Sequence, residues 1–256
     1  MSGAPLRPVE WKAEEYDQQS AAPHEEWSAQ ILARLLLKGG ETVLDAGCGT
    51  GRLTKRLVDR VPDGKVIGVD ASAAMLEKAR EHLGEDADLR QQDLTKLDLG
   101  EEKVDAVYSS AVFHWIQDHE ALFRSLHGVM RPGTWLEAQC GGQDNIAEIE
   151  RALEALSGDE RFAPYLRTGR QGMNFASIGD TESRLATAGF SDIRAWTQPW
   201  PVHPPDPAGY VSTVILPWHL DRLPDELHQP FIRAVLETAP RPLVVNYVRL
   251  NISARA

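Results

Sequence analysis

The segment TVLDAGCGTG, residues 42–51, constrains the fold of this chain more than any other, because an apolar run leads directly into three closely spaced glycines. Residues 42–46 are typical of a short buried strand. Gly47, Gly49 and Gly51 carry no side chain at the point where the chain must turn sharply toward a helix that begins near Arg52. A strand, a glycine turn and a helix in this order bring the backbone close to a ligand, so we expect a ligand site at this turn.

The spacing of these glycines disfavours one large group of ligands. The pattern is Gly-x-Gly-x-Gly, and Arg52 stands where a dinucleotide-binding Gly-x-Gly-x-x-Gly would have its third glycine. The Arg52 side chain would obstruct the close packing of helix on strand that this glycine allows. A pyrophosphate cofactor is therefore disfavoured, and with it a nicotinamide-dependent oxidoreductase.

Acidic residues follow the next two expected strands. Asp70 ends the apolar run KVIGVD, about twenty residues beyond the glycines, and Asp93 ends the third strand, in DLRQQDL. In an open parallel sheet a ligand lies across the carboxyl ends of neighbouring strands, so Asp70 can accept both ribose hydroxyls of a nucleoside. Each such charge-assisted hydrogen bond contributes about 1.5–3 kcal/mol. Asp93 can accept from an exocyclic adenine amine and the amide of Leu94 can donate to a ring nitrogen, so the three strand ends together indicate adenosine.

The order of the elements predicts an α/β fold with a doubly wound, mostly parallel sheet. A helix over 25–38, which Lys38-Gly39-Gly40 would end, precedes the first strand. The further helices that we expect are 52–61, 72–83, 119–130 and 182–189. The strands that we expect are 42–46, 65–70, 88–92, 104–112, 134–140, 192–198 and 245–255.

Two segments do not fit this alternation, 141–180 and 199–244, and long inserts at the carboxyl ends of strands usually form binding loops or lids. We expect them to cap a substrate pocket, within a single domain over 1–256 that has N-terminal cap helices in 1–40 and a cofactor-binding core over 41–140. The residues that we expect in the pocket walls are Tyr165, Met173, Phe175, Trp200, Tyr210, Trp218 and Phe231.

The composition of the chain limits which classes of partner it can bind. The formal net charge is −11, from 38 acidic and 27 basic residues, so a nucleic-acid backbone would be repelled over most of the surface. No apolar run approaches a membrane-spanning length or a signal peptide. The two cysteines, Cys48 and Cys140, fit a reducing compartment. We expect a cytoplasmic protein with a small-molecule partner and neither a nucleic acid nor a membrane, and the oligomeric state is left open.

Several motifs together resemble the class I S-adenosylmethionine-dependent methyltransferases, namely DAGCGTG, GVDASAAML, QQDL, SSAVFHWIQDH and LRPG. The resemblance spans most of the chain. It implies S-adenosylmethionine as cofactor and a Rossmann-like seven-stranded sheet whose last strand, VNYVRLNISAR, is antiparallel and inserted beside the fifth. Within the superfamily, this strand, the opening from Trp11 to Tyr16 and the cluster Phe113-His114-Trp115 are most similar to the trans-aconitate and juvenile hormone acid methyltransferase group, which methylates small carboxylic acids.

The resemblance also implies which residues meet the cofactor. Asp45 would orient the turn or meet the amino group of the methionine moiety, and its alternative is a helix N-cap. Met75 would pack on the adenine face, and plain core packing is its alternative. Ser110 follows the fourth strand, where small residues let backbone approach the methionine end. The cofactor residues that we expect are Asp45, Gly47, Cys48, Gly49, Gly51, Asp70, Ala71, Met75, Asp93, Leu94 and Ser110.

The acceptor side of the site is expected around His114 and Trp115, which are the candidate catalytic residues. The face of Trp115 would attract a sulfonium, and His114 would be a general base, a donor to a substrate carboxylate or a wall residue, with donor or wall favoured. A carboxylate acceptor is already ionised and needs no base. The candidate substrate-binding residues are Tyr16, His24, Arg167, Arg170 and Trp218; His24 stands where relatives commonly have Gln, three residues before Trp27.

The expected activity is therefore O-methylation of a small carboxylic acid. C- or N-methylation of an isoprenoid or another small metabolite is the alternative within the same class, and it would require a base such as His114. A non-catalytic cofactor-binding protein is also left open. His203, His219 and His228 have no metal-ligand spacing, so no metal site is expected.

Overall fold

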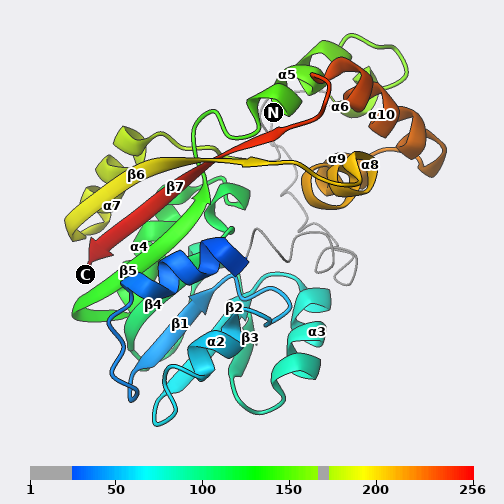
Figure 1. The fold of residues 1–256 in the computed structure, drawn as a ribbon. Helices are drawn as coiled ribbons and strands as arrows, with labels where there is room; N and C mark the ends of the chain where they lie inside the picture. The colour runs from blue at the N-terminus through cyan, green and yellow to red at the C-terminus, as the bar shows by residue number, and fades with distance from the viewer. Residues whose placement is uncertain (1–24, 167–172) are drawn as a thin grey trace.

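The computed structural model describes residues 25–166 and 173–256 and builds them around a seven-stranded sheet (Figure 1). The strands stand in the order β3-β2-β1-β4-β5-β7-β6, and β7 is antiparallel to both of its neighbours while the other pairs of adjacent strands are parallel. This arrangement confirms the predicted α/β sheet with its last strand inserted beside the fifth. The strands are β1 (Thr42–Ala46), β2 (Lys65–Asp70), β3 (Asp88–Gln91), β4 (Val104–Ser110), β5 (Met130–Gly141), β6 (Ser191–Val202) and β7 (Val245–Arg255).

Both faces of the sheet are covered, because successive side chains of a strand point to opposite sides. Leu44, Ile67 and Val107 belong to the larger apolar cluster, which they share with α4 (His119–Val129) and α7 (Ile178–Ala188). Their neighbours Val43, Val66 and Tyr108 belong to a second cluster, together with residues of the helix 25–34 and of α2 (Thr54–Val58). The remaining helix of this layer, α3 (Ala73–Leu83), begins at the N-cap Ser72, whose hydroxyl accepts from the amide of Met75 at 3.3 Å.

Several predicted boundaries were wrong. The first helix ends at residue 34 instead of 38, because the amides of Lys38 and Gly39 donate to the carboxylate of Glu41 at 2.7 and 2.8 Å and hold a loop. Helix α2 is half as long as expected. Strand β5 begins at Met130 and so includes the Arg131-Pro132-Gly133 turn. The start of β5 depends on the pairing of Met130 with Val104 in β4, which local pattern does not carry.

Strand β6 also runs further than expected, to Val202, so that Pro199 and Pro201 lie in the sheet instead of in the second insertion. This strand is at the edge of the sheet and pairs only with β7. A proline has no N–H to donate to a neighbouring strand. An edge strand tolerates it because the side without a neighbouring strand makes no ladder hydrogen bonds.

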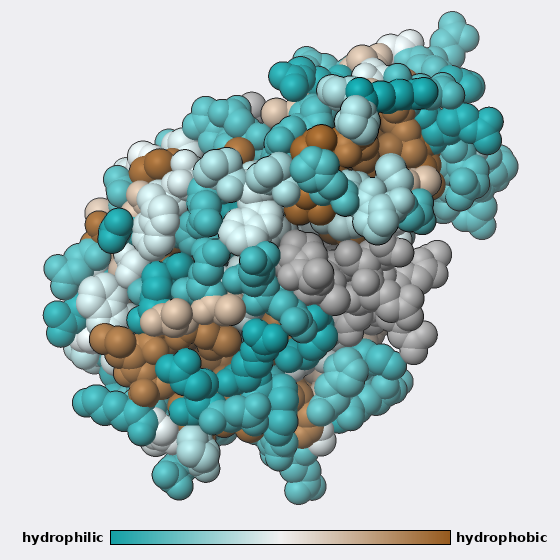
Figure 2. Space-filling view, viewed as in Figure 1, coloured by the Kyte–Doolittle hydropathy of each residue, from teal (hydrophilic) through white to brown (hydrophobic). Residues whose placement is uncertain are grey.

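The two insertions meet beyond the carboxyl ends of the parallel strands and form a cap (Figure 1). Its helices are α5 (Ala147–Leu156), α6 (Ala163–Leu166), α8 (Pro207–Tyr210), the π-helix η3 (Val211–Ile215), α9 (Pro217–Leu220) and α10 (Asp225–Thr238). They share a third apolar cluster, in which the rings of Phe162 and Phe231 lie 5.2 Å apart. Figure 2 shows apolar side chains gathered on the cap between α10 and α8, and a second apolar area at the lower left of the same face. Among the described residues no helix is long and apolar enough to cross a membrane.

Candidate functional site

The glycine turn after β1 has the geometry of a ligand cradle. Gly47, Gly49 and Gly51 all have positive φ, at +89°, +54° and +79°, a conformation that side chains disfavour. A Cβ on Gly47 would lie 2.2 Å from Val112 Cγ2, and one on Gly51 would lie 3.1 Å from the Cα of Ala79 in α3. A Cβ on Gly49 would meet no atom of the described residues within 4 Å. Two glycines therefore allow close packing, and around the middle one the described part of the chain leaves room for a ligand to approach.

Asp70 closes this cradle at the end of β2. Its Oδ2 accepts from the amide of Gly49 and its Oδ1 from the amide of Ser72, each at 2.9 Å. Burial raises the pKa of this carboxyl above its usual value, and the two amides oppose that shift. Each carboxylate oxygen accepts more than one hydrogen bond, so both can still receive a ribose hydroxyl. The next residue, Ala71, is exposed, and its carbonyl accepts from Gln91 Nε2 at 3.1 Å.

Asp45 is almost completely buried beneath the turn, with 2% of its surface exposed. Its Oδ2 accepts from Thr54 Oγ1 at 2.7 Å, and burial raises the pKa of the carboxyl to about 7. The N-cap of α2 is Leu53, without a side-chain cap bond, so the alternative of Asp45 as an N-cap is wrong. A buried carboxyl of this pKa is stabilised in its ionised form by an approaching cation, such as an ammonium group.

The side chains of Cys48 and Met75 are buried inside the protein. The Sγ of Cys48 would lie 3.1 Å from a Cβ on Gly68, so the side chain covers β2 and only the Cys48 backbone lines the turn. The amides of Cys48 and Gly47 both donate to the carbonyl of Val69, at 3.0 and 2.8 Å. Met75 is 5% exposed.

The prediction that Asp93 ends the third strand was wrong, since β3 ends at Gln91. Asp93 is the N-cap of the 3-10 helix η1 (Leu94–Lys96), and its Oδ1 accepts from the amide and hydroxyl of Thr95 at 2.9 and 2.8 Å. The side chain of Leu94 lies in the main core. Ser110 Oγ is buried. The cofactor roles of these residues stay predictions.

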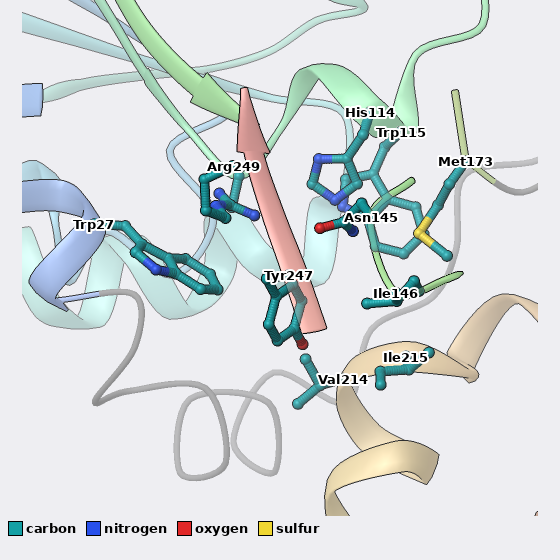
Figure 3. Close-up of a pocket in the computed structure, with 11 residues that line it drawn as sticks. Trp27, His114, Trp115, Asn145, Ile146, Met173, Val214, Ile215, Tyr247 and Arg249 are labelled. Atoms are coloured by element: carbon teal, nitrogen blue, oxygen red, sulfur yellow. The ribbon is translucent and has the colours of Figure 1, made fainter. Parts of the chain in front are cut away.

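A pocket lies beyond the carboxyl ends of β4 and β5, between the sheet and the cap (Figure 3). The packing of Gly47 against Val112 connects it to the glycine turn, because Val112 directly precedes the 3-10 helix η2 (Phe113–Trp115). The residues that line the pocket are Trp27, Ala111, His114, Trp115, Asn145, Ile146, Met173, Val214, Ile215, Tyr247 and Arg249. The two candidate catalytic residues, His114 and Trp115, therefore lie in one pocket beside the cradle.

The position of His114 is fixed from three sides. The amide of Gly141 donates to its Nδ1 at 3.2 Å, and its carbonyl accepts from the amide of Asn174 at 2.7 Å. Its ring stacks on that of Phe175, with the ring centroids 5.9 Å apart, and the centroid of the Trp115 ring lies 5.1 Å away. Since Nδ1 accepts a hydrogen bond, the proton of the neutral imidazole is on Nε2. This tautomer makes His114 a donor.

The chain reaches η2 through a strained residue. Ala111 has φ of +62°, in the left-handed region, and its amide donates to the carbonyl of Gln139 at 2.7 Å. A non-glycine residue in this region costs about 1–3 kcal/mol and is retained where the surroundings require it. Here the turn directs His114 and Trp115 toward the pocket.

Arg249 is a charged pocket residue that sequence reasoning missed. It lies on β7 with 2% of its surface exposed, its guanidinium carbon is 3.8 Å from the centroid of the Trp27 ring, and its Nε donates to Gln139 Oε1 at 3.2 Å. In Figure 3, Arg249 and Trp27 lie on one side of the pocket, opposite His114 and Trp115, and Asn145 lies beside His114. A buried cation among aromatic side chains attracts an anionic group. The one signal in the sequence was a charged residue inside a strand expected to be central.

The pocket does not include every predicted substrate residue. Trp218 lies on α9 outside the pocket lining, where the guanidinium carbon of Arg222 is 3.4 Å from its ring centroid. Tyr16, His24, Arg167 and Arg170 lie outside the described residues. Of the expected wall residues, Met173 lines the pocket and Phe175 stacks on His114, whereas Tyr165, Trp200, Tyr210 and Phe231 pack in the cap cluster. Within 25–166 and 173–256 no three His, Cys, Asp or Glu residues gather as a metal site.

Comparison with known proteins agrees with this geometry. Residues 43–133 match a family model described as a methyltransferase domain. Trans-aconitate 2-methyltransferase of Variovorax paradoxus is 30% identical over 223 residues, which are 85% of this chain and 83% of the relative. The enzyme of the same name from Methylobacterium radiotolerans is 39% identical over 137 residues, or 53% of this chain, and the match spans about half of that relative, 51%. The structure of the YcgJ protein from Bacillus subtilis has a TM-score of 0.66 at 15% identity and covers 91% of this chain and 98% of that one, a likeness of fold.

Proposed function

The chain belongs to the class I S-adenosylmethionine-dependent methyltransferases, in the group of the trans-aconitate 2-methyltransferases, and from this membership we propose that it methylates an oxygen of a small carboxylic acid. S-adenosylmethionine is the cofactor. The observation that carries the proposal is the guanidinium of Arg249, a buried cation in a pocket whose walls are mostly apolar and aromatic. Such walls accommodate the body of an organic acid, and the cation binds its carboxylate.

The glycine turn supports the cofactor assignment through its own chemistry. Asp70 would bind the ribose hydroxyls with the carboxylate that the amides of Gly49 and Ser72 hold in place. Asp45 would bind the ammonium group of the methionine moiety, which would stabilise the ionised form of a carboxyl whose pKa burial raises to about 7. When bound, S-adenosylmethionine supplies an electrophilic methyl carbon, which passes to the acceptor as its bond to sulfur breaks.

The acceptor side needs a binding group and no base, because a carboxylate is ionised at neutral pH. Arg249 would hold one carboxylate oxygen and Nε2–H of His114 would donate a second hydrogen bond, which leaves an oxygen lone pair to attack the methyl carbon. Trp27 and Trp115 would exclude water from the reacting atoms. Alignment of an already reactive nucleophile accounts for most of the rate in such a displacement.

Methylation of carbon or nitrogen would require a pocket residue that accepts a proton. An acceptor of that kind gives up a proton, and His114 is the histidine among the residues that line the pocket. With Nδ1 accepting from the amide of Gly141, the other ring nitrogen carries the proton and does not accept one. This argues against His114 as a base and for an acceptor that needs none.

A panel of acceptors tests the proposal, with transfer of a labelled methyl group as the readout. The panel contains trans-aconitate, 4-methylpentanoate, phenylacetate, a phenol, an amine and a prenyl diphosphate. We expect base-labile label, the sign of a methyl ester, on at least one acid, and a rate that is independent of pH above the pKa of that acid. Label on carbon or nitrogen alone, lost in a His114→Ala variant, would replace the proposal with base-assisted methylation. Binding of the cofactor without any turnover would indicate a non-catalytic protein.

The proposal includes a small-molecule partner and a cytoplasmic location. Both cysteines of the chain, Cys48 and Cys140, are buried free thiols. Burial raises the pKa of both thiols, which keeps them protonated and unreactive. Thiols that remain unpaired are typical of a reducing compartment.

A further inference from the structure

A row of polar side chains lies on one face of the sheet behind Arg249. Strands β5 and β7 are antiparallel, and Glu137, Gln139 and Gly141 stand opposite Ser253, Asn251 and Arg249. Alternate residues of a strand share a face, so these three pairs lie on the same side. The residues between them, including Ala138, Leu250 and Ile252, belong to the main apolar core on the other side.

The polar pairs are connected by hydrogen bonds that lead to Arg249. Ser253 Oγ donates to Glu137 Oε1 at 2.6 Å, and Gln139 Nε2 donates to Asn251 Oδ1 at 2.8 Å. Gln139 Oε1 then accepts from Arg249 Nε at 3.2 Å. Gln139 and Asn251 are 1% and 0% exposed, so water does not compete for these bonds.

The helix 25–34 determines which way these amides face. Arg34 Nη1 donates to Asn251 Oδ1 at 3.3 Å, and a guanidinium has only donors, so the amide of Asn251 must present its oxygen there. That oxygen in turn accepts from Gln139 Nε2, which leaves the oxygen of Gln139 directed at Arg249. The orientation of both amides is therefore set from the Arg34 end.

The same helix holds both ends of this connection. Arg34 forms an ion pair with Glu137, with Nε and Oε2 2.5 Å apart, and Nη2 donates to the carbonyl of Ala138 at 3.3 Å. Trp27 lies seven residues earlier, about two helical turns, and its ring contacts the guanidinium of Arg249. Arg249 is thus confined between Trp27 and Gln139, and both depend on how the helix is docked.

We propose that Gln139, oriented by Arg34 through Asn251, is a positioning residue that fixes the guanidinium of Arg249 and so sets the affinity of the pocket for the carboxylate of the acceptor. The inference rests on the proposed function, in which Arg249 binds that carboxylate. Arginine has many rotamers, and its binding geometry is useful only when one of them is selected. Here the amide oxygen of Gln139 and the ring of Trp27 both contribute to that selection.

Two substitutions at Gln139 test the role, with the panel acid of lowest KM as probe. Gln139→Leu removes the acceptor for Arg249, and KM for the acid should rise about tenfold or more, while the affinity for S-adenosylhomocysteine changes less than about twofold. Gln139→Glu keeps an acceptor oxygen in place and adds a negative charge beside Arg249. It should weaken binding of the anionic acid but leave binding of its neutral methyl ester, measured as product inhibition, within about threefold.

Arg34 gives a matched pair of variants. Arg34 and Arg194 both place their guanidinium over the ring of Trp196, at 5.1 and 4.8 Å from the centroid, but only Arg34 reaches Asn251. Arg34→Gln should raise KM for the acid about as much as Gln139→Leu does, and the double variant should add little, because both act on the same guanidinium. Arg194→Gln should leave KM unchanged.

These experiments distinguish a failure of the proposed function from a failure of the positioning role of Gln139. If the unmodified protein binds and methylates no acid, the proposed function fails. If it methylates an acid and Gln139→Leu lowers the melting temperature while KM of the folded protein stays the same, the row of polar residues only stabilises the sheet and this inference is wrong. Equal weakening of acid and methyl ester by Gln139→Glu would overturn it as well, because that result indicates general disorder of the pocket.

Discussion

The guanidinium carbon of Arg249 lies 3.8 Å from the ring centroid of Trp27, a contact that joins the last strand of the sheet to the helix 25–34. A guanidinium over the face of an indole gains about 0.5–2 kcal/mol. The contact therefore holds a cation at the wall of the pocket without neutralising it.

Removal of this cation should abolish acid binding selectively. In Arg249→Met the apolar contact with Trp27 is largely retained and the charge is lost, so we expect kcat/KM for the acid acceptor to fall by about two orders of magnitude. Calorimetry should show unchanged affinity for S-adenosylhomocysteine. Arg222→Met is the control, since Arg222 also stacks on a tryptophan, Trp218, but outside the pocket lining. Equal losses in both variants would mean that the charge at position 249 has no specific role.

Asp70 should determine affinity for the cofactor. Asp70→Ala removes the two hydrogen bonds that we assign to the ribose and should weaken S-adenosylmethionine binding by roughly 2–4 kcal/mol. Calorimetry should also detect no binding of NAD to the unmodified protein. Asp86→Ala, which removes an exposed partner of Lys55, serves as the control. An unchanged affinity in Asp70→Ala would contradict the role of this carboxylate.

Asp45 should make cofactor binding depend on pH. Burial raises the pKa of its carboxyl from 3.8 to about 7 in the free protein, so the folded state binds this proton more tightly than the unfolded chain does. The contribution of Asp45 to stability therefore falls as the pH rises between these two values. An ammonium group at Asp45 favours the ionised form, so affinity for S-adenosylmethionine should rise with pH and level off above about 7.

Calorimetry in buffers of different ionisation enthalpy should then detect a proton released on binding below pH 7. In Asp45→Asn the release should disappear and the affinity should be lower at pH 8. The same proton release in this variant would assign the titration to another group.

Trp115 and its neighbour Phe113 should separate function from stability. Trp115 lines the pocket, so Trp115→Ala should reduce turnover by about tenfold or more with a small change in melting temperature. Phe113 is 1% exposed and packs edge-on against Phe123, so Phe113→Ala should instead cost about 3–5 kcal/mol of stability. If Trp115→Ala loses stability on that scale and keeps its specific activity, Trp115 is a core residue.

The cofactor side of the site could be predicted from the sequence because its information is local. Gly47, Gly49, Gly51 and Asp70 lie within about twenty-five residues of each other, and a strand, a turn and a helix fix their relative positions. The doubly wound, mostly parallel sheet was predicted from the alternation of strands and helices, and the place of the last strand beside the fifth from the resemblance of the motifs. Asp93 was placed wrongly because a strand boundary depends on pairing that local pattern does not show.

The acceptor side depends on contacts between distant segments. Arg249 reaches Gln139 and Trp27 only because β7 enters the sheet beside β5 in one register, Gly141 opposite Arg249. A slip of one residue would direct Arg249 into the apolar core. The sequence indicated the strand but carried no local sign of the register, so Arg249 was missed and arginines in the insertion were preferred.

The position of a bound acid tests the central claim most directly. A crystal structure with S-adenosylhomocysteine and the panel acid of lowest KM should place one carboxylate oxygen within hydrogen-bond distance of the Arg249 guanidinium and the other directed at the sulfur of the cofactor. A carboxylate bound elsewhere, with a carbon or nitrogen of the acceptor facing the sulfur, would contradict O-methylation of a carboxylic acid at this site.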